Sequence, residues 1–327
     1  MKKRLQVMGI ILLSMLVLLA CDSDEASGDG NKFKIGVTQF VEHPSLDRAY
    51  EGFQDALADA EVEVEYDYQN AQGDQNNVKP IADNFVADGV DLIFANATPS
   101  AQSAKNATGD IPIVFTSVTD AVGAELVEDM DAAGENITGV VDLHPDAIKE
   151  TVNFIDKYFN NATVGLVYNS GEQNSVAQIE AVQEAAENTN LEFTERTVST
   201  SAEVQQATST IVDEADVIYI ITDNTVVSAL DSVVGVANDQ EIPLIVGEPD
   251  SLAKGGFATY GIDYYSIGYR TGEMAVDILT DEDSPEEMSV EYPPEIEMFI
   301  NKEAAEEQGI EWDEDWDDAE FVETESE

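Results

Sequence analysis

Apolar residues along the chain follow two periods, one typical of buried strands and one typical of amphipathic helices. Short continuous apolar runs have the length of buried strands, whereas residues 46–58 carry apolar side chains at helical spacing. In the first part of the chain, strands are predicted at 33–38, 62–68, 90–95 and 111–115, and helices at 46–58 and 78–87. Strands that alternate with helices of this length predict right-handed βαβ units and a parallel sheet.

The same order of elements returns in the second part of the chain. Strands are predicted there at 162–168, 191–197, 217–221 and 242–246, and helices at 177–186 and 203–214. Corresponding strands begin about 130 residues apart, and the dipeptide Ile111-Pro112 has a counterpart in Ile242-Pro243. The repeat predicts an α/β protein with two Rossmann-like lobes, each built on a parallel sheet, that face each other across a cleft. A single long doubly wound sheet is the alternative.

The N-terminal segment has the pattern of an export signal. Lys2, Lys3 and Arg4 precede a largely apolar run over residues 5–20, which is short for a membrane span and typical of a signal-peptide core. The run ends in Leu18-Leu19-Ala20-Cys21, which resembles the bacterial lipobox, and Cys21 is the only cysteine of the chain. We therefore predict a lipoprotein signal peptide at 1–21, lipidation of Cys21 and a flexible polar tether at 22–32. An uncleaved anchor helix with an incidental cysteine is the alternative.

Acidic residues dominate the composition of this 327-residue chain. Against 68 Asp and Glu there are 14 Lys and Arg, a formal net charge of −54, which argues against binding nucleic acid or an anionic membrane surface through a basic patch. The acids are spread along the chain, and residues 311–327 hold only ten of them. Because salt shortens the Debye length from roughly 10 Å at 0.1 M to about 3 Å at 1 M, we interpret the acidity as halophilic or alkaliphilic adaptation. The acidic tail at 313–327 is expected to fray beyond Trp312.

The residues directly after the predicted strands are the candidates for ligand binding, because ligands of open parallel sheets bind beyond the carboxyl ends of the strands. In both halves these loops are rich in small polar side chains, and helix capping explains a part of them. The predicted ligand-binding residues are Phe40, Leu46, Asp47, Thr98, Ser100, Ser117, Thr119, Tyr168, Ser170, Asn174, Ser175, Asp223, Asn224, Glu248 and Asp263.

The chemistry of these loops favours a small zwitterion over a phosphate or a dicarboxylate. They contain no Lys or Arg, and the sequence has neither a GxGxxG nor a GxxxxGK[ST] motif. Helix N-termini and hydroxyls can hold one carboxylate, and we assign this role to Thr98, Ser170 and Ser175. An ammonium group needs an acid, which Asp223, Glu248 or Asp263 can supply, with Asp263 as our hypothesis. Aromatic residues near the same edge could enclose an apolar side chain; they are Phe40, Phe115, Tyr168, Tyr260 and Tyr264.

Catalysis, a metal and a cofactor are not expected. His43 and His144 are the only histidines and lie in opposite halves, so a His-rich metal site is excluded and no serine has a histidine base nearby. No GxSxG elbow occurs. Carboxylate pairs such as Asp223 with Glu248 are expected by chance in so acidic a chain.

Several segments together resemble the TrpX-like family of substrate-binding lipoproteins of bacterial ABC transporters, whose members bind aromatic amino acids. The resemblance covers about residues 34–309, and its most similar segments are 33–39 with 44–47, 97–102, 168–175, 222–226 and 258–265. It implies the type I periplasmic-binding-protein fold, in which three segments cross between the lobes; we place them near 139–143, 260–264 and 295–300. Lobe I would then comprise 33–140 plus 264–292, and lobe II 141–262 plus 296–312.

The resemblance also implies a function without catalysis. It predicts a receptor, anchored by lipid to the extracytoplasmic side of the cell membrane, that closes around a solute by hinge bending and delivers it to an ABC permease and its ATPase. The most favoured solute is an aromatic amino acid. A ligand-sensing receptor of the same fold for a signalling partner remains an alternative, as does another small solute such as a sugar or nucleoside.

Overall fold

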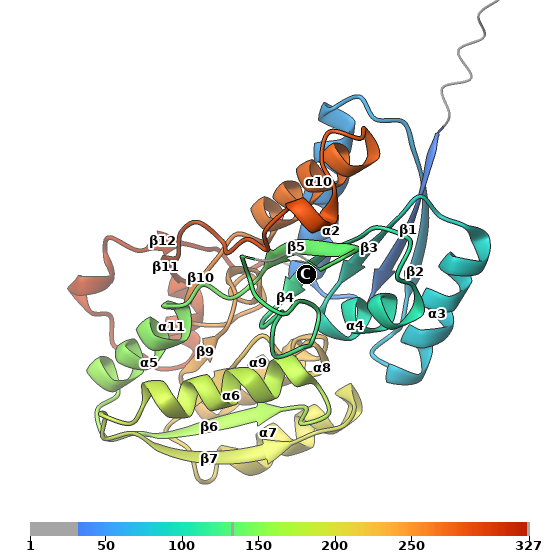
Figure 1. Ribbon diagram of the computed structural model, residues 1–327. Helices are drawn as coiled ribbons and strands as arrows, with labels where there is room; N and C mark the ends of the chain where they lie inside the picture. The colour runs from blue at the N-terminus through green and yellow to red at the C-terminus, as the bar shows by residue number, and fades with distance from the viewer. Residues whose placement is uncertain (1–31, 132–133, 326–327) are drawn as a thin grey trace, which may run out of the picture. The chain divides into compact units, whose positions relative to one another are not determined.

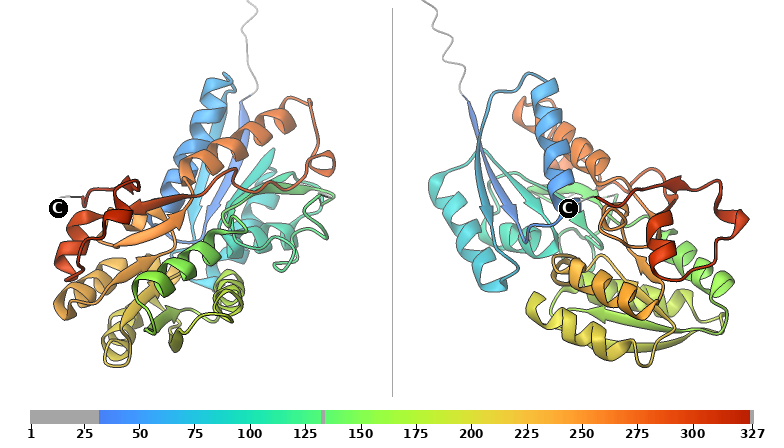
Figure 2. Two further views of the ribbon diagram at one scale, coloured as in Figure 1. Left: turned by 90° about the vertical axis from the view of Figure 1, so that its left-hand side faces the viewer. Right: turned by 180° about the vertical axis from the view of Figure 1, so that it is seen from behind.

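Two separate β-sheets, each covered by helices on both faces, account for the part of the chain that the structure describes. The computed structural model describes residues 32–131 and 134–325 (Figures 1 and 2). The predicted signal peptide, the lipidation site Cys21 and the tether up to residue 31 lie outside these residues. Because two sheets are present, the alternative of one continuous sheet is wrong, and the predicted α/β class with two lobes is confirmed.

The first sheet and its helices, called lobe I below, contain five parallel strands in the order β2, β1, β3, β4, β5. The strands are β1 (Phe33–Gln39), β2 (Val64–Asn70), β3 (Leu92–Asn96), β4 (Ile113–Val118) and β5 (Ile137–Val141). One face is covered by α2 (Pro44–Asp59) and α10 (Tyr264–Leu279), the other by α3 (Gln75–Asp88) and α4 (Thr98–Ala107). Ile35 and Val37 pack on the first face, and Ile93 and Phe115 on the second. Burial on both faces explains why these strands are apolar throughout.

The second sheet and its helices, called lobe II below, contain seven strands in the order β12, β11, β10, β9, β8, β6, β7. Strand β11 runs antiparallel to β10, and the other pairs are parallel. The strands are β6 (Thr163–Tyr168), β7 (Glu192–Thr197), β8 (Val217–Ile220), β9 (Leu244–Val246), β10 (Ala258–Gly261), β11 (Glu297–Ile300) and β12 (Glu320–Phe321). Helices α5 (Ala147–Tyr158), α6 (Gln173–Ala185) and α11 (Lys302–Glu307) lie on one face, and α7 (Val204–Ile211), α8 (Asn224–Val227) and α9 (Leu230–Gln240) on the other.

The chain passes between the two sheets three times. After β5 it enters α5 of lobe II, after β10 it enters α10 of lobe I, and before β11 it returns to lobe II. The connecting segments are 142–146, 262–263 and 292–296. They lie at or next to the segments predicted to cross, and three crossings make each lobe discontinuous in sequence.

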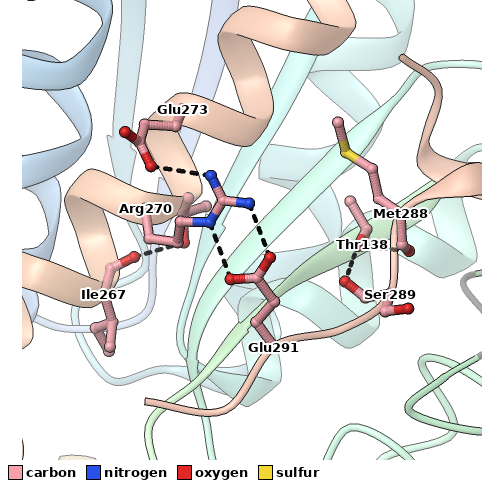
Figure 3. Close-up of polar contacts among 8 residues, drawn as sticks. Thr138, Ile267, Arg270, Glu273, Met288, Ser289 and Glu291 are labelled. Carbon is pink, nitrogen blue, oxygen red and sulfur yellow. Dashed lines mark hydrogen bonds and ion pairs between the residues drawn. The ribbon is translucent and has the colours of Figure 1, made fainter. Parts of the chain in front are cut away.

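The third crossing begins at a segment that is fastened to lobe I. The backbone of Glu291 pairs with β5 through its N–H to Gly139 and through its carbonyl to Val141. Its carboxylate accepts from Arg270 Nε at 2.9 Å and Nη2 at 2.8 Å, and Arg270 Nη1 also bonds Glu273 (Figure 3). Thr138 Oγ1 donates to the carbonyls of Met288 and Ser289 close by. These bonds fasten residues 288–291 to lobe I immediately before the crossing at 292–296.

The acidic C-terminal segment is ordered by its aromatic residues, so the expectation that it frays beyond Trp312 is wrong. Trp316, in the 3-10 helix Glu314–Trp316, is only 2% exposed and packs against Phe154, Tyr158 and Phe257. Strand β12 then pairs with β11. Burying one indole among three aromatic rings outweighs the repulsion of exposed acids, because large aromatic side chains bury 150–250 Å² each.

No helix among the residues that the structure describes combines the length and the apolar character needed to cross a bilayer.

Candidate functional site

The loops that follow the strands of the two lobes meet each other. His43, after β1, places Nε2 3.5 Å from Oδ1 of Asn224, after β8. Gln178 on α6 donates from Nε2 to Oγ1 of Thr119, after β4, at 3.0 Å. All four side chains are buried. The strand-end loops of lobe I and lobe II therefore form one enclosed polar region, as the rule for open parallel sheets predicts.

In lobe II, Asp223 ties three loops together. It is fully buried and accepts from the backbone N–H of Asn169 at 2.6 Å, from Ser175 Oγ at 2.7 Å and from the N–H of Val226 at 2.8 Å. Burial, and then the negative charge of Glu172, raise the pKa of Asp223 to about 7. Because its oxygens and the Ser175 hydroxyl are already paired, Asp223 and Ser175 hold the loops in place and have little capacity left for a ligand.

Glu172, the residue before α6, forms a second buried group of contacts beside Asp223. Its carboxylate accepts from Asn224 Nδ2 at 2.6 Å and from both the N–H and the hydroxyl of Thr225, at 3.1 and 2.6 Å. These hydrogen bonds fix the backbone at the start of α6 and thereby the position of Asn174.

Helices α4 and α6 both begin at this region without a side-chain cap. The N-cap positions are Ala97 and Glu172, and neither side chain bonds the free N–H groups of its helix. The hydroxyls of Thr98 and Ser117 and Oδ1 of Asn174 are buried without a hydrogen-bond partner among the described residues. Free N–H groups and unpaired polar atoms at helix N-termini form a ready site for an anion such as a carboxylate.

The backbone of lobe I is strained at the same place. Ala97 has φ +87° and Ser117 has φ +57°, both in the half of backbone space that disfavours side chains. Such strain persists where the surrounding structure over-determines it, and it concentrates at ligand-binding sites.

Three neighbouring acids, Asp142 in the first crossing and Glu248 and Asp250 after β9, form a group that we call the hinge acids. Tyr264 OH donates to Asp142 Oδ2 at 2.9 Å, and Thr119 Oγ1 donates to Oδ1 at 3.2 Å. Ser251 Oγ bonds the carboxylate of Glu248, which is 1% exposed. None of the three forms an ion pair with a Lys or Arg that the structure describes.

Partial or full burial raises the pKa of each of the hinge acids. Burial raises the pKa of Glu248 to about 8, with a smaller contribution from the charges of Asp250 and Asp142. Burial also raises the pKa of Asp142 to about 6, although the hydroxyls of Tyr264 and Thr119 lower it. His43 cannot neutralise them, because burial lowers its pKa to about 4 and leaves the imidazole uncharged at neutral pH. A cation that enters with a ligand would therefore favour the ionised form of these carboxyl groups.

Most of the predicted ligand-binding residues are gathered in this region. Buried strand-end residues on the list are Thr98, Ser100, Ser117, Thr119, Asn174, Ser175, Asp223, Asn224 and Glu248. Phe40 and Leu46 are buried in the apolar core of lobe I, together with Phe115. Tyr168 is half-buried and its hydroxyl donates to Glu195 on the edge strand β7. Tyr260 packs against the core of lobe II, and Tyr264 is buried at the hinge acids.

Three predicted residues are exposed: Asp47, Ser170 and Asp263. Asp47 accepts from Gln39 Nε2 at 2.7 Å. Asp263 caps α10, because its carboxylate accepts from the N–H groups of Tyr265 and Ser266 and from the Ser266 hydroxyl. An exposed carboxylate that is saturated by its own helix does not fit the enclosed ammonium ligand that we expected at Asp263.

Comparison with known proteins identifies the chain. The family model described as "ABC transporter substrate binding protein" matches residues 34–318. This chain belongs to the ABC transporter substrate-binding proteins. Members of this family bind solutes and are not enzymes.

Three individual relatives are similar to this chain over about nine-tenths of its length. A protein of Clostridioides difficile named "Tyrosine-binding protein" is 39% identical over 92% of this chain and 90% of its own length. A Streptococcus pneumoniae ABC domain solved in complex with L-Trp is 34% identical with a TM-score of 0.84, and it covers 89% of this chain and 100% of its own. A Vibrio cholerae conserved domain protein is 37% identical with a TM-score of 0.85, and it covers 90% and 100%. These likenesses confirm the predicted family, and more distant solute-binding proteins confirm the type I fold.

Two important residues of this substrate-binding protein were missed in the sequence. Asp142 lies within the crossing predicted at 139–143, so an acid at a crossing was a usable signal. Gln178 lies four residues after Asn174 and hence on the same face of α6. Its position in the sequence does not distinguish Gln178 from any other glutamine on a helix. Its hydrogen-bond partners, Thr119 and Thr222, lie in other elements.

No group of three His, Cys, Asp or Glu side chains is arranged to hold a metal ion in residues 32–131 and 134–325.

Proposed function

We propose that this substrate-binding protein captures an amino acid with an aromatic side chain, and that the hinge acids bind its ammonium group. The observation that carries the proposal is the hinge acids, of which Glu248 is 1% exposed and Asp142 and Asp250 are half-buried. None of them forms an ion pair within the described residues, and they lie where loops of both lobes meet. Ionising a buried and unpaired carboxyl group is expensive, which is why the pKa values of Glu248 and Asp142 are raised, and an ammonium group would favour the ionised form. A neutral sugar or nucleoside would not.

The other end of the ligand fits the helix N-termini. The carboxylate would bind at the start of α4 or α6, where Thr98 and Asn174 offer unpaired buried atoms within the described structure, as does Ser117 near the end of β4. Thr119 links this end to the hinge acids, because it bonds both Asp142 and Gln178, one turn after Asn174. One small zwitterion could therefore touch both groups at once.

The aromatic character of the ligand is supported by the relatives. One is named for tyrosine and another was solved with L-Trp. Their similarity covers about nine-tenths of this chain.

A panel of ligands and truncated analogues tests the proposal. We expect L-tyrosine or L-tryptophan to raise the melting temperature, since a ligand at 100 times its Kd stabilises by about 2.7 kcal/mol. Tyramine lacks the carboxylate and 4-hydroxyphenylpropionate lacks the ammonium group, so each should bind at least about 30-fold more weakly by calorimetry, because a desolvated charge pair is worth about 2–5 kcal/mol. Glucose and adenosine are the negative controls. A shift with either control and none with the amino acids would contradict the proposal.

We also propose that the chain works as a lipid-anchored receptor outside the cytoplasm, together with an ABC permease and its ATPase. The basic residues 2–4, the apolar run and the single cysteine Cys21 support this location. Mass spectrometry of the mature protein should find an N-terminal, diacylglyceryl-modified Cys21. Its replacement by alanine should leave the precursor uncleaved and without the lipid, whereas a lipid-free chain that keeps residues 1–20 in the wild type would argue for the uncleaved anchor.

A further inference from the structure

Gln178 joins the two lobes through its side-chain amide. It lies in the second turn of α6 and is 2% exposed. Within lobe II its Oε1 accepts from the backbone N–H of Thr222 at 3.2 Å, and its Nε2 donates to the Thr222 hydroxyl. The same Nε2 donates to Thr119 Oγ1 of lobe I at 3.0 Å. The backbone N–H of Thr222 can only donate, so it fixes which end of the amide carries the nitrogen.

The contact with Thr119 belongs to a longer chain of hydrogen bonds. Thr119 accepts from Gln178 and donates to Asp142 Oδ1 at 3.2 Å, while Tyr264 OH donates to Asp142 Oδ2 at 2.9 Å. An ionised carboxylate is an acceptor only, so the Thr119 hydrogen points to Asp142 and a Thr119 lone pair is left for Gln178. Each bond thereby orients the next, and the chain runs from lobe II through lobe I to the first crossing and α10.

We propose that Gln178 is the closure latch of this protein: a positioning residue that slows the opening of the two lobes by its bond to Thr119. The proposal rests on the proposed function in that binding of a solute is coupled to closure. The bond to Thr119 crosses between the lobes, whereas both bonds to Thr222 stay within lobe II. Opening must therefore break the bond to Thr119 and can leave the bonds to Thr222 intact.

Loss of the bond between Gln178 and Thr119 should change the rate of ligand dissociation and not the preference among ligands. A buried amide and hydroxyl that lose each other during opening remain unpaired until water enters, and an unsatisfied buried polar group is unfavourable. Encounter with the solute takes place while the lobes are apart, before this bond forms. Removing the latch should thus affect every solute equally and leave the association rate nearly unchanged.

Stopped-flow kinetics with L-tyrosine and L-tryptophan test the latch. We expect Gln178→Ala to raise koff by about 5- to 30-fold, equally for both amino acids, with kon changed less than about threefold. Thr119→Val, which removes the hydroxyl at nearly constant shape, should raise koff similarly, and the double variant should be no worse than the more affected single variant. Unchanged koff, factors that differ between the two amino acids, or additive effects would each overturn the proposal.

A measurement on the ligand-free protein distinguishes a wrong latch proposal from a wrong proposed function. Small-angle X-ray scattering of the ligand-free protein should give a larger radius of gyration for Gln178→Ala and Thr119→Val than for the wild type, because the closed population falls. If the wild type binds neither amino acid, the proposed function fails while this comparison still decides on the latch. Equal radii for wild type and both variants would overturn the latch.

Discussion

Replacing Glu248 by glutamine is expected to stabilise the ligand-free protein and to remove most of its affinity for an amino acid. The two effects have one cause: the buried carboxyl group of Glu248 forms no ion pair among the residues described, and in our proposal it binds the ammonium group of the ligand. Glutamine keeps the shape and can still accept from Ser251, but it carries no charge. We expect the Kd for L-tyrosine or L-tryptophan to rise by about 30-fold or more, measured by calorimetry at pH 8.

The gain in stability from Glu248→Gln should grow with pH. An unfolded chain ionises this group above its ordinary pKa of 4.5, whereas the folded protein keeps the proton until about pH 8. Between these values the folded state binds more protons than the unfolded state, so the stability of the wild type falls as pH rises. Below pH 4.5 both states are protonated and the penalty vanishes. At pH 8 the variant should be more stable by on the order of a few kcal/mol, and at pH 5 by much less.

Asp263→Asn is the matched control for Glu248→Gln. It also removes one carboxylate near the crossings, but Asp263 is exposed and caps α10, and asparagine caps a helix about as well. Its affinity and melting temperature should stay close to those of the wild type at every pH. The assignment of the ammonium group to the hinge acids is wrong if Glu248→Gln binds as tightly as the wild type, or if Asp263→Asn loses affinity to the same degree.

Replacing Gly268 by alanine should severely destabilise lobe I. Helices α2 and α10 cross there with their backbones in contact, so a Cβ atom at Gly268 would lie 1.9 Å from the carbonyl oxygen of Ala49 and 2.6 Å from its carbon. Neither atom belongs to a flexible side chain, so the helices would have to separate along a shared apolar interface. Overpacking of this kind costs about 3 kcal/mol or more, and we expect the melting temperature to fall by roughly 6–12 °C.

Gly235→Ala is the same chemical change, but it should raise the stability of the protein. Gly235 lies in the exposed face of α9, and nothing lies within 4 Å of its would-be Cβ atom. Alanine there should stabilise the protein by about 0.5–1 kcal/mol, because glycine loses more backbone entropy in a helix. Thermal unfolding of both variants by circular dichroism checks the pair. If Gly268→Ala melts within a degree or two of the wild type, the close approach of α2 and α10 is not required for the fold.

Part of the candidate site could be predicted from local sequence. The rule that ligands bind beyond strand ends led to Thr98, Ser117, Asn174 and Glu248, because a strand's end can be located from its apolar run. The same rule could not distinguish a side chain that is free for a ligand from one that its own loop already uses. Asp223 and Asp263 both follow strands and both cap helices, yet one is fully buried and the other exposed.

The alternation of apolar runs along this sequence was enough to determine two α/β lobes, because burial on both faces of a parallel sheet leaves a signal within each strand. The order of elements and the chemistry of the loops could likewise be predicted from residues that are neighbours in the sequence. Only the tertiary structure decided that Trp316 anchors the acidic end, that Asp142 lies near the buried Glu248, and that Gln178 reaches Thr119. Burial and pairing depend on atoms far apart in sequence, and these two properties decide whether a carboxylate, an amide or an indole is structural or functional.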